Sequence, residues 1–206
     1  MTRPEPTDER EVGDGLAALV PAAVAGDRAA MRALLGGVAP VVARACRRVM
    51  GRGEAEAEDV AQQALTGFVA RLPTFRGEST VAHFAERIAV YRALSARRDA
   101  GVRRRHVDVV EGGGLDDVSD ASHAPDARLD ERHRRSLLVS ALEALPEPQA
   151  EALALHFLFD HTVAEIAGMA GVPQETVRSR LRLGKQALRA LIAKDAALSA
   201  LREGTS

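Results

Sequence analysis

Aromatic residues are scarce in this chain of 206 residues, which has no Trp, one Tyr and five Phe. Stacking of aromatic side chains on bases therefore contributes little to any contact with nucleic acid, and aliphatic side chains must fill the core. Apolar residues make up 46% of the chain and charged residues 28%, a balance typical of a globular protein and not of a disordered one. Ala and Leu are abundant, which favours helices.

Cysteine is nearly absent as well. Cys46 is the only Cys in the sequence, which excludes an internal disulfide and a multi-cysteine zinc cluster. We interpret Cys46 as a small buried hydrophobic residue in a protein of a reducing compartment. We find no stretch of the roughly 20 apolar residues that cross a bilayer, and the polar N-terminus does not resemble a secretion signal. The sequence therefore predicts a cytoplasmic protein without membrane insertion.

Charge is balanced overall and unevenly distributed. The 28 basic and 29 acidic residues give no argument for a nucleic-acid partner by their totals. Apolar periodicity stops between Glu111 and Glu131, where three consecutive Gly and a Pro occur. We predict an all-α protein with two small helical domains, at residues 13–106 and 132–196. A flexible acidic linker is predicted at residues 107–131, and it contains Asp116, Asp117, Asp120, Asp126 and Asp130.

The first predicted domain contains three clear helical patterns. Asp27 after Gly26 is a typical N-cap of a helix that runs to Met50, before Gly51. A second pattern covers Glu54 to Leu72 and ends at Pro73; its apolar stripe is Ala61, Leu65, Phe68 and Leu72. A third begins at Ser79 or Thr80 and ends in the run Arg103–Arg105, and its apolar stripe is Val81, Phe84, Ile88 and Tyr91.

The second predicted domain contains a helix-turn-helix. Two helices, about Arg134–Ala144 and Gln149–Phe159, precede it and are separated by a Pro-containing segment. A third helix starts near Thr162, Gly171 makes a tight turn, and a fourth helix opens near Pro173. From Val172 to Lys194 the chain has six basic residues and one acidic residue, a net charge of +5. A helix with one apolar and one basic face suits a phosphate-lined major groove, so we predict DNA binding; a solvated basic face is the alternative.

Three sequence blocks occur in a characteristic order: Ala57–Gln63, then Phe75–Thr80 with Arg87–Ala89, then Ala144–Pro146 with the helix-turn-helix. In this order they resemble the bacterial alternative sigma factors of the extracytoplasmic-function (ECF) group. The resemblance implies two helical domains, region two and region four, that bind core RNA polymerase and promoter DNA. It implies promoter recognition, DNA melting and transcription initiation, with no cofactor and no catalysis by this chain. It leaves open whether an anti-sigma factor also binds.

The resemblance also implies a role for individual residues. It implies that Asp59, Gln62 and Gln63 dock on the largest polymerase subunit. It implies that Arg76, Ser79 and Thr80 capture a flipped base of the minus-10 element. The residues that contact the adjacent strand are then His83, Arg87 and Tyr91. The residues that the resemblance places in the major groove at the minus-35 element are Thr176, Arg178, Ser179, Arg180 and Arg182. Further along that helix, Lys185 and Arg189 are expected to contact phosphates.

The chain departs from the usual family pattern at four positions. Phe84 stands where Trp is usual, Gln63 where an acidic residue is usual, and Tyr91 and Ser95 where Asn and Asp are usual. These departures keep a second interpretation open, a polymerase-binding decoy that does not melt promoters. A third is a helix-turn-helix regulator that never joins polymerase. A fourth is a metal enzyme using His156, Asp160 and His161, for which no fourth ligand or general base is evident.

Overall fold

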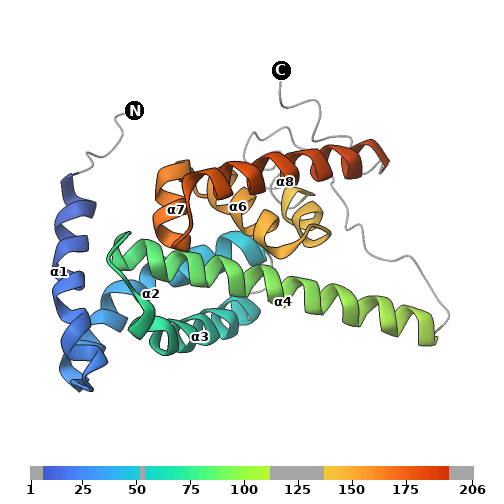
Figure 1. Ribbon diagram of the computed structural model, residues 1–206. Coiled ribbons are helices and arrows are strands. Elements are labelled where there is room, and N and C mark those ends of the chain that lie inside the picture. Colours follow the sequence, from blue (N-terminus) through green and yellow to red (C-terminus); the bar gives the residue numbers. More distant parts are fainter. Residues whose placement is uncertain (1–6, 52–53, 112–136, 195–206) are drawn as a thin grey trace, which may run out of the picture.

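The computed structural model describes residues 7–51, 54–111 and 137–194, and these contain helices and no strand (Figure 1). The predicted all-α fold class is confirmed. The segment 112–131 of the predicted linker, with its five Asp, lies outside the described residues. The N-terminal half consists of α1 (Thr7–Val24), α2 (Arg28–Met50), α3 (Glu54–Arg71), a short 3-10 helix (Leu72–Thr74) and α4 (Val81–Glu111). The C-terminal half consists of a helix at 137–143, α6 (Glu147–Phe157), α7 (Val163–Ala170) and α8 (Gln174–Lys194).

Helix α2 begins and ends where the sequence predicts. The Asp27 carboxylate accepts hydrogen bonds from the backbone N–H groups of Ala29 (2.7 Å) and Ala30 (3.0 Å), which have no partner inside the helix. Gly51 ends the helix with a φ of 74°. By length and composition alone α2 is apolar enough to cross a membrane. Its apolar stripe, which includes Leu34 and Val38 with no exposed surface, instead packs into the helical core.

Helix α4 is longer than predicted. It begins at the N-cap Thr80, whose hydroxyl accepts a hydrogen bond from the backbone N–H of His83 (3.1 Å). The sequence predicts an end near residues 103–105 and a linker from residue 107, but the helix continues to Glu111. One internal Gly, Gly101, costs a helix only about 1 kcal/mol. Three consecutive Gly first occur after Glu111, so no strong helix-breaking sequence is met before that point.

Helix α6 starts earlier than predicted. The sequence analysis takes Pro148 as part of a break and starts the helix at Gln149, whereas α6 begins at Glu147. Pro148 lies in the first turn, where the missing N–H has no intrahelical partner to lose and the fixed φ already suits a helix. Proline therefore opens this helix.

Helix α7 begins with a capping box. The Thr162 hydroxyl accepts a hydrogen bond from the Glu165 N–H (3.3 Å), and the Glu165 carboxylate accepts from the Thr162 N–H (2.7 Å). Partial burial raises the pKa of Glu165, but the hydrogen bonds from Thr162 and the nearby imidazoles of His161 and His83 lower it more. The net pKa therefore lies below the ordinary value of 4.5. Gly171 ends α7 in the left-handed conformation, with φ of 61°, and turns the chain into α8.

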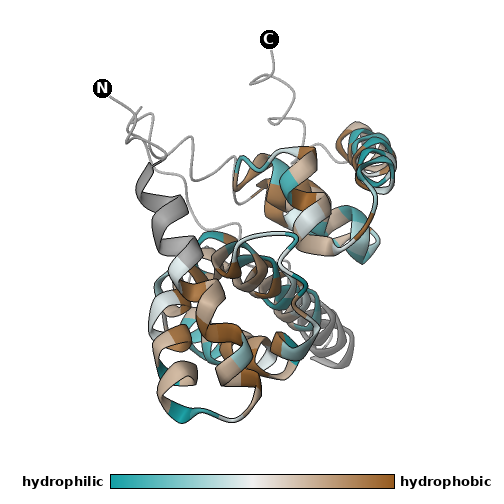
Figure 2. Ribbon diagram, turned by 60° about the vertical axis from the view of Figure 1, so that its left-hand side comes forward, coloured by the Kyte–Doolittle hydropathy of each residue, from teal (hydrophilic) through white to brown (hydrophobic). Residues whose placement is uncertain are grey.

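Both halves share one apolar core. Helix α4 packs against α2 and α3 on one side and against α6 and α7 on the other, as Figures 1 and 2 show. Apolar residues face the inside of both groups of helices in Figure 2, and the buried residues form one continuous cluster. Cys46 lies in it without exposed surface, and burial raises its pKa to about 12. The interpretation of Cys46 as a core residue is confirmed.

The capping box yields a prediction about pH. Because the folded-state pKa of Glu165 is lowered, its contribution to the free energy of unfolding is present above the unfolded-state pKa and is lost as pH falls through the folded-state pKa. Glu165→Ala should therefore destabilise the chain by about 1 kcal/mol at pH 7, and the difference should shrink below about pH 4.5. Urea unfolding followed by circular dichroism measures both values. Glu165→Gln, which keeps the box without the charge, is the control; a difference independent of pH would contradict the assignment.

Candidate nucleic-acid interface

The three residues predicted to dock on polymerase share one exposed face of α3. Asp59, Gln62 and Gln63 are exposed, whereas Val60 and Ala64 between and beyond them are buried. The buried side of α3 packs on α2 and α4. The structure therefore brings the predicted docking residues together on a solvent-facing polar surface.

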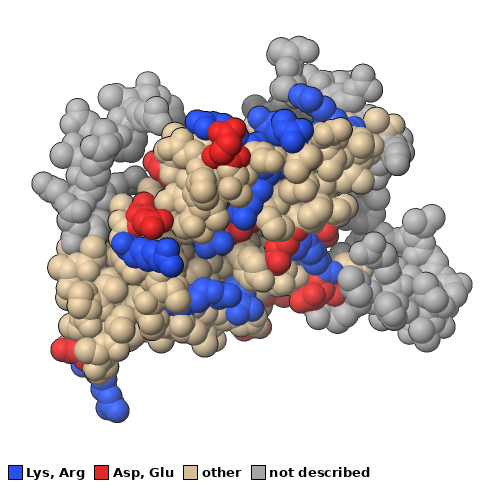
Figure 3. All heavy atoms as spheres, in the orientation of Figure 1, with Lys and Arg blue, Asp and Glu red and all other residues tan. Residues whose placement is uncertain are grey.

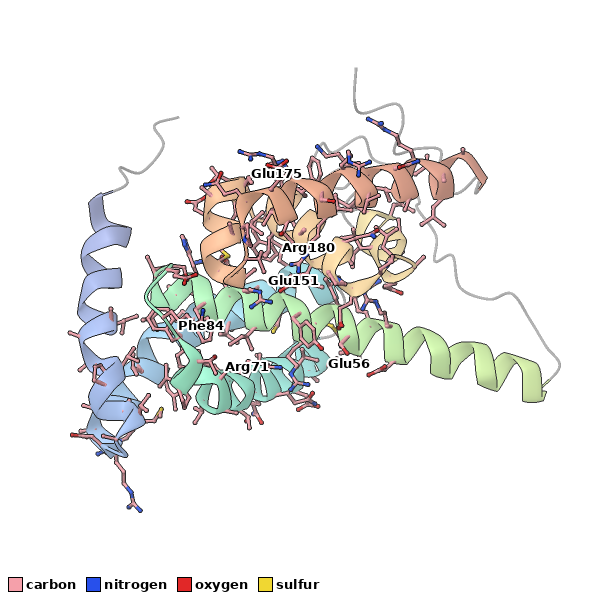
Figure 4. The ribbon with its side chains drawn as sticks, in the orientation of Figure 1. Glu56, Arg71, Phe84, Glu151, Glu175 and Arg180 are labelled. Carbon is pink, nitrogen blue, oxygen red and sulfur yellow. The ribbon has the colours of Figure 1, made fainter. Side chains whose placement is uncertain are left out.

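The loop before α4 is anchored by aromatic rings. The Phe84 ring, only 8% exposed, lies 5.3 Å from the Phe75 ring and 6.1 Å from the Phe68 ring (Figure 4). Phe75 opens the loop, so the ring cluster fixes its start against α3 and α4. Arg76 next to it is exposed, and Ser79 is half-buried. Phe84, at the position where Trp is usual in the family, is thus a core residue under this loop.

The residues predicted to follow the strand along α4 are partly covered. The His83 ring makes an edge contact with the His161 ring, 4.9 Å between centroids. The Arg87 Nε lies 2.7 Å from Glu151 Oε1 without hydrogen-bond alignment, and an Arg87 Nη donates to the Met169 carbonyl (3.3 Å). Two of the three predicted residues therefore contact the C-terminal half. The third, Tyr91, is half-buried, with the Arg71 guanidinium 5.9 Å from its ring centroid.

Helix α8 presents basic side chains on its outer face. Val177, Leu181 and Gly184 are buried against α6 and α7. Figure 3 shows Lys and Arg side chains gathered along the top of the molecule, where α8 lies. The exposed members of the predicted recognition set are Arg178, Ser179, Arg182 and Arg189.

The remaining members of the predicted set lie elsewhere on α8. Arg180 is half-buried, and Figure 4 shows it on the side of α8 that faces α4, toward Glu151. Residues two positions apart are about 200° apart around a helix, so Arg180 does not share the Arg178 face. Lys185 is half-buried with its ammonium 5.1 Å from the Phe157 ring centroid. Thr176 is half-buried as well.

Acidic residues that the sequence analysis did not single out contact this basic set. Glu175 accepts a hydrogen bond from Arg178 at 2.7 Å, and the Gln174 amide oxygen accepts another at 3.3 Å. The Glu175–Arg178 pair is three residues apart on one helix, a spacing that signals such contacts. Glu86 and Glu151, in contrast, have partners in the other half of the chain, and no local pattern reveals them.

The three residues of the metal-enzyme interpretation make other contacts. His156 Nδ1 lies 2.9 Å from the His161 carbonyl oxygen, and His161 Nε2 lies 2.6 Å from Glu86 Oε2. No group of His, Cys, Asp and Glu able to hold a metal ion occurs in the part of the chain that the structure describes. His161 instead joins the two halves.

Two known family models match separate parts of the chain. The family model for sigma-70 region 2 matches residues 34–103, and the model for sigma-70 region 4 matches residues 135–188. The two matches fall within the two predicted domains and in the order that the sequence blocks indicate. The region 2 match argues against a helix-turn-helix regulator unrelated to polymerase.

Individual relatives agree with the family models. The ECF RNA polymerase sigma factor SigD of Mycobacterium tuberculosis is 32% identical over 171 residues, which cover 81% of this chain and 78% of SigD. The ECF RNA polymerase sigma-E factor of Escherichia coli is 30% identical over 138 residues, which cover 63% of this chain and 70% of that protein.

Two solved structures are also similar. CnrH in complex with the cytosolic domain of CnrY has a TM-score of 0.49 and 21% identity, covering 87% of this chain and 97% of CnrH. The sigma factor RpoE of Bartonella quintana, in complex with the anti-sigma factor NepR, has a TM-score of 0.44 and 22% identity, covering 80% and 97%. From the two region matches and the extent of the SigD alignment, we conclude that this chain belongs to the ECF RNA polymerase sigma factors, alternative sigma factors that bind core polymerase and direct promoter recognition and transcription initiation.

Proposed function

We propose that this sigma factor makes its contacts through three surfaces, the exposed face of α3, the loop 75–80 and the outer face of α8. The α3 face docks on core polymerase, the loop captures a base of the melted minus-10 element, and α8 reads the minus-35 element. The observation that carries the proposal is the exposed basic face of α8 on a chain whose other half presents a separate polar face on α3. The chain acts in the cytoplasm, beside polymerase and DNA, and catalyses no reaction itself.

The docking surface is tested with Asp59→Ala combined with Gln62→Ala. Losing a carboxylate and an amide from a contact should weaken association with core RNA polymerase about tenfold, equal to about 1.4 kcal/mol. Titration of core enzyme with fluorescently labelled full-length protein measures the affinity. Asp99→Asn, at an exposed acidic position on α4 and away from the α3 face, is the control. Equal affinity of the double variant and the control would show that this face does not dock.

The loop is tested with Arg76→Ala rather than with all three predicted residues. Thr80 caps α4, so replacing it also destabilises the helix by about 1 kcal/mol and confuses the result. Arg76→Ala should slow open-complex formation on a duplex promoter, because the loop no longer offsets the few kcal/mol of unpairing a base. A pre-melted template should restore transcription. Arg44→Ala, an exposed arginine on α2 outside the loop, is the control. An equal defect of Arg76→Ala on both templates would show that the loop has another role than melting.

Two variants, Arg178→Ala and Arg189→Ala, distinguish base recognition by α8 from its contacts with the phosphate backbone. Both side chains are exposed, and they lie 11 positions, about three turns, apart on the helix. Arg178→Ala should cost about 1 to 3 kcal/mol at the preferred duplex and relax base choice there. Arg189→Ala should weaken all duplexes alike and reduce the salt slope by about 0.9. Titration against matched and mismatched promoter duplexes at several salt concentrations measures this; altered base preference in Arg189→Ala alone would reverse the assignment.

A further inference from the structure

Arg178, on the outer face of α8, is held by two acceptors of its own helix. The Glu175 carboxylate accepts a hydrogen bond from Arg178 Nη1 at 2.7 Å, and the Gln174 amide oxygen accepts one from Arg178 Nη2 at 3.3 Å. The side chains of Arg178 and Glu175 are 56% and 81% exposed, so this network lies on the protein surface. Figure 4 shows Glu175 on the side of α8 that faces away from α4. The two acceptors therefore orient the guanidinium where α8 is open to a ligand.

The network leaves enough donors on Arg178 for a base. A guanidinium has five N–H groups in one plane, and the two hydrogen bonds use one on each terminal nitrogen. Three N–H groups remain, and a bidentate contact with O6 and N7 of guanine needs two. Fixing the plane of the guanidinium before binding lowers the entropy that the side chain loses when it contacts a base. Arg178 is therefore already arranged for a bidentate contact.

Glu175 differs in charge from the rest of α8. It is the only acidic residue from Val172 to Lys194, a segment with six basic residues. Its position in the first turn suits the helix dipole, which favours negative charge at a helix N-terminus. The same carboxylate lies on the face that the proposed function gives to DNA, where phosphates repel it. Glu175 therefore lowers the affinity of α8 for DNA of any sequence, unless it supports a compensating contact.

The pair with Glu175 also limits the other contact that Arg178 can make. A free Arg side chain can turn to a phosphate, which adds affinity without sequence preference. The Glu175 carboxylate competes with that phosphate for Nη1, because both are anionic acceptors. Guanine does not compete in this way, since its O6 and N7 accept from the N–H groups that remain. Glu175 therefore lowers nonspecific binding more than specific binding.

We propose that Glu175, together with Gln174, is a positioning residue that fixes Arg178 for guanine at the minus-35 element and keeps it away from phosphates. Specificity then has two sources, a prepared contact with guanine and weaker binding of every other sequence. This inference rests on the proposed function for the entry of α8 into the major groove. It adds that an acidic residue, acting through Arg178, decides how strictly α8 selects its base.

Glu175→Ala in the full-length chain is the direct test. The outer face of α8 is exposed, so titration of labelled promoter duplexes by fluorescence anisotropy needs no polymerase. One probe is the duplex that the wild-type chain prefers in a randomised minus-35 library. The other has adenine in place of guanine at the position where Arg178→Ala relaxes base choice.

The two probes should respond to Glu175→Ala in opposite directions. We expect affinity for the changed duplex to rise about threefold and the ratio of preferred to changed affinity to fall about tenfold. The salt slope on the changed duplex should grow by about 0.9, because Arg178 then reaches a phosphate. If Glu175 only stabilised α8, its loss would change both affinities equally; an unchanged ratio therefore overturns the proposal.

Asp160→Asn is the matched control for charge. Asp160 is an exposed carboxylate of region four outside α8, and Asn tolerates its φ of 58°. This variant removes one negative charge, as Glu175→Ala does, and should leave the ratio unchanged. Glu175→Gln keeps an acceptor oxygen for Arg178, so its ratio should lie between those of the wild type and Glu175→Ala. A fall as large as that of Glu175→Ala in either variant would show an effect of charge alone and overturns the positioning role.

A double variant shows whether Glu175 acts through Arg178. When Arg178→Ala is already present there is no guanidinium to position, so adding Glu175→Ala should change neither the ratio nor the salt slope. A further change in the ratio would mean that Glu175 contacts a base itself, which overturns the proposal.

Failure of the proposed function gives a different result. If Arg178→Ala leaves base choice and affinity unchanged, α8 does not read DNA through Arg178, and the assignment of the recognition face fails. If Arg178→Ala relaxes base choice and Glu175→Ala does not, only the positioning role is wrong.

Discussion

Helix α4 packs against other helices on two of its sides at once, and the positions of the other described helices depend on this packing. One side closes the core with α2 and α3, and the other meets α6 and α7. The second side is partly polar: Glu86 lies against His161, and Arg87 and Arg97 each form an ion pair with a Glu of the C-terminal half. Ion pairs removed from water return little net free energy, because desolvation nearly offsets attraction. These pairs therefore add little net stability to a contact that also shares the apolar core of the chain.

Most helix ends could be predicted because their causes are local. Asp27 and Gly51 bound α2, Pro73 follows α3, and Gly171 separates the helices of the helix-turn-helix. The apolar spacing of α8 likewise identified its buried face, and the basic side chains opposite indicated a DNA-binding surface. The start of α6 and the end of α4 were predicted wrongly, because the effect of a proline or glycine there depends on its position in the helix. Pro148 opens a helix where proline is more readily taken as a break, and α4 continues through a single glycine.

The polar contacts between α4 and the C-terminal half could not be predicted, because the paired residues are far apart in the sequence and follow no local spacing. Glu86 is 75 residues from His161, and Arg87 is 82 residues from Met169. From the sequence, Arg87 is expected to face DNA, whereas nothing distinguishes Glu86 from the other charged residues of this long helix. The same holds for Phe84, whose burial against Phe75 and Phe68 depends on how the loop folds back. The exposure of the predicted residues on α3 and on the outer face of α8 was therefore predictable, and the contacts between the two halves were not.

The division of each ion pair between the two halves bears on how such proteins are recombined. Region four modules exchanged between relatives can keep their recognition helix and still lose Glu151, Glu143 or His161 as partners of α4. A hybrid of that kind joins two intact domains whose facing polar groups no longer pair. Exchange of region four in this chain is then limited by the residues that face α4, which lie away from the recognition face of α8.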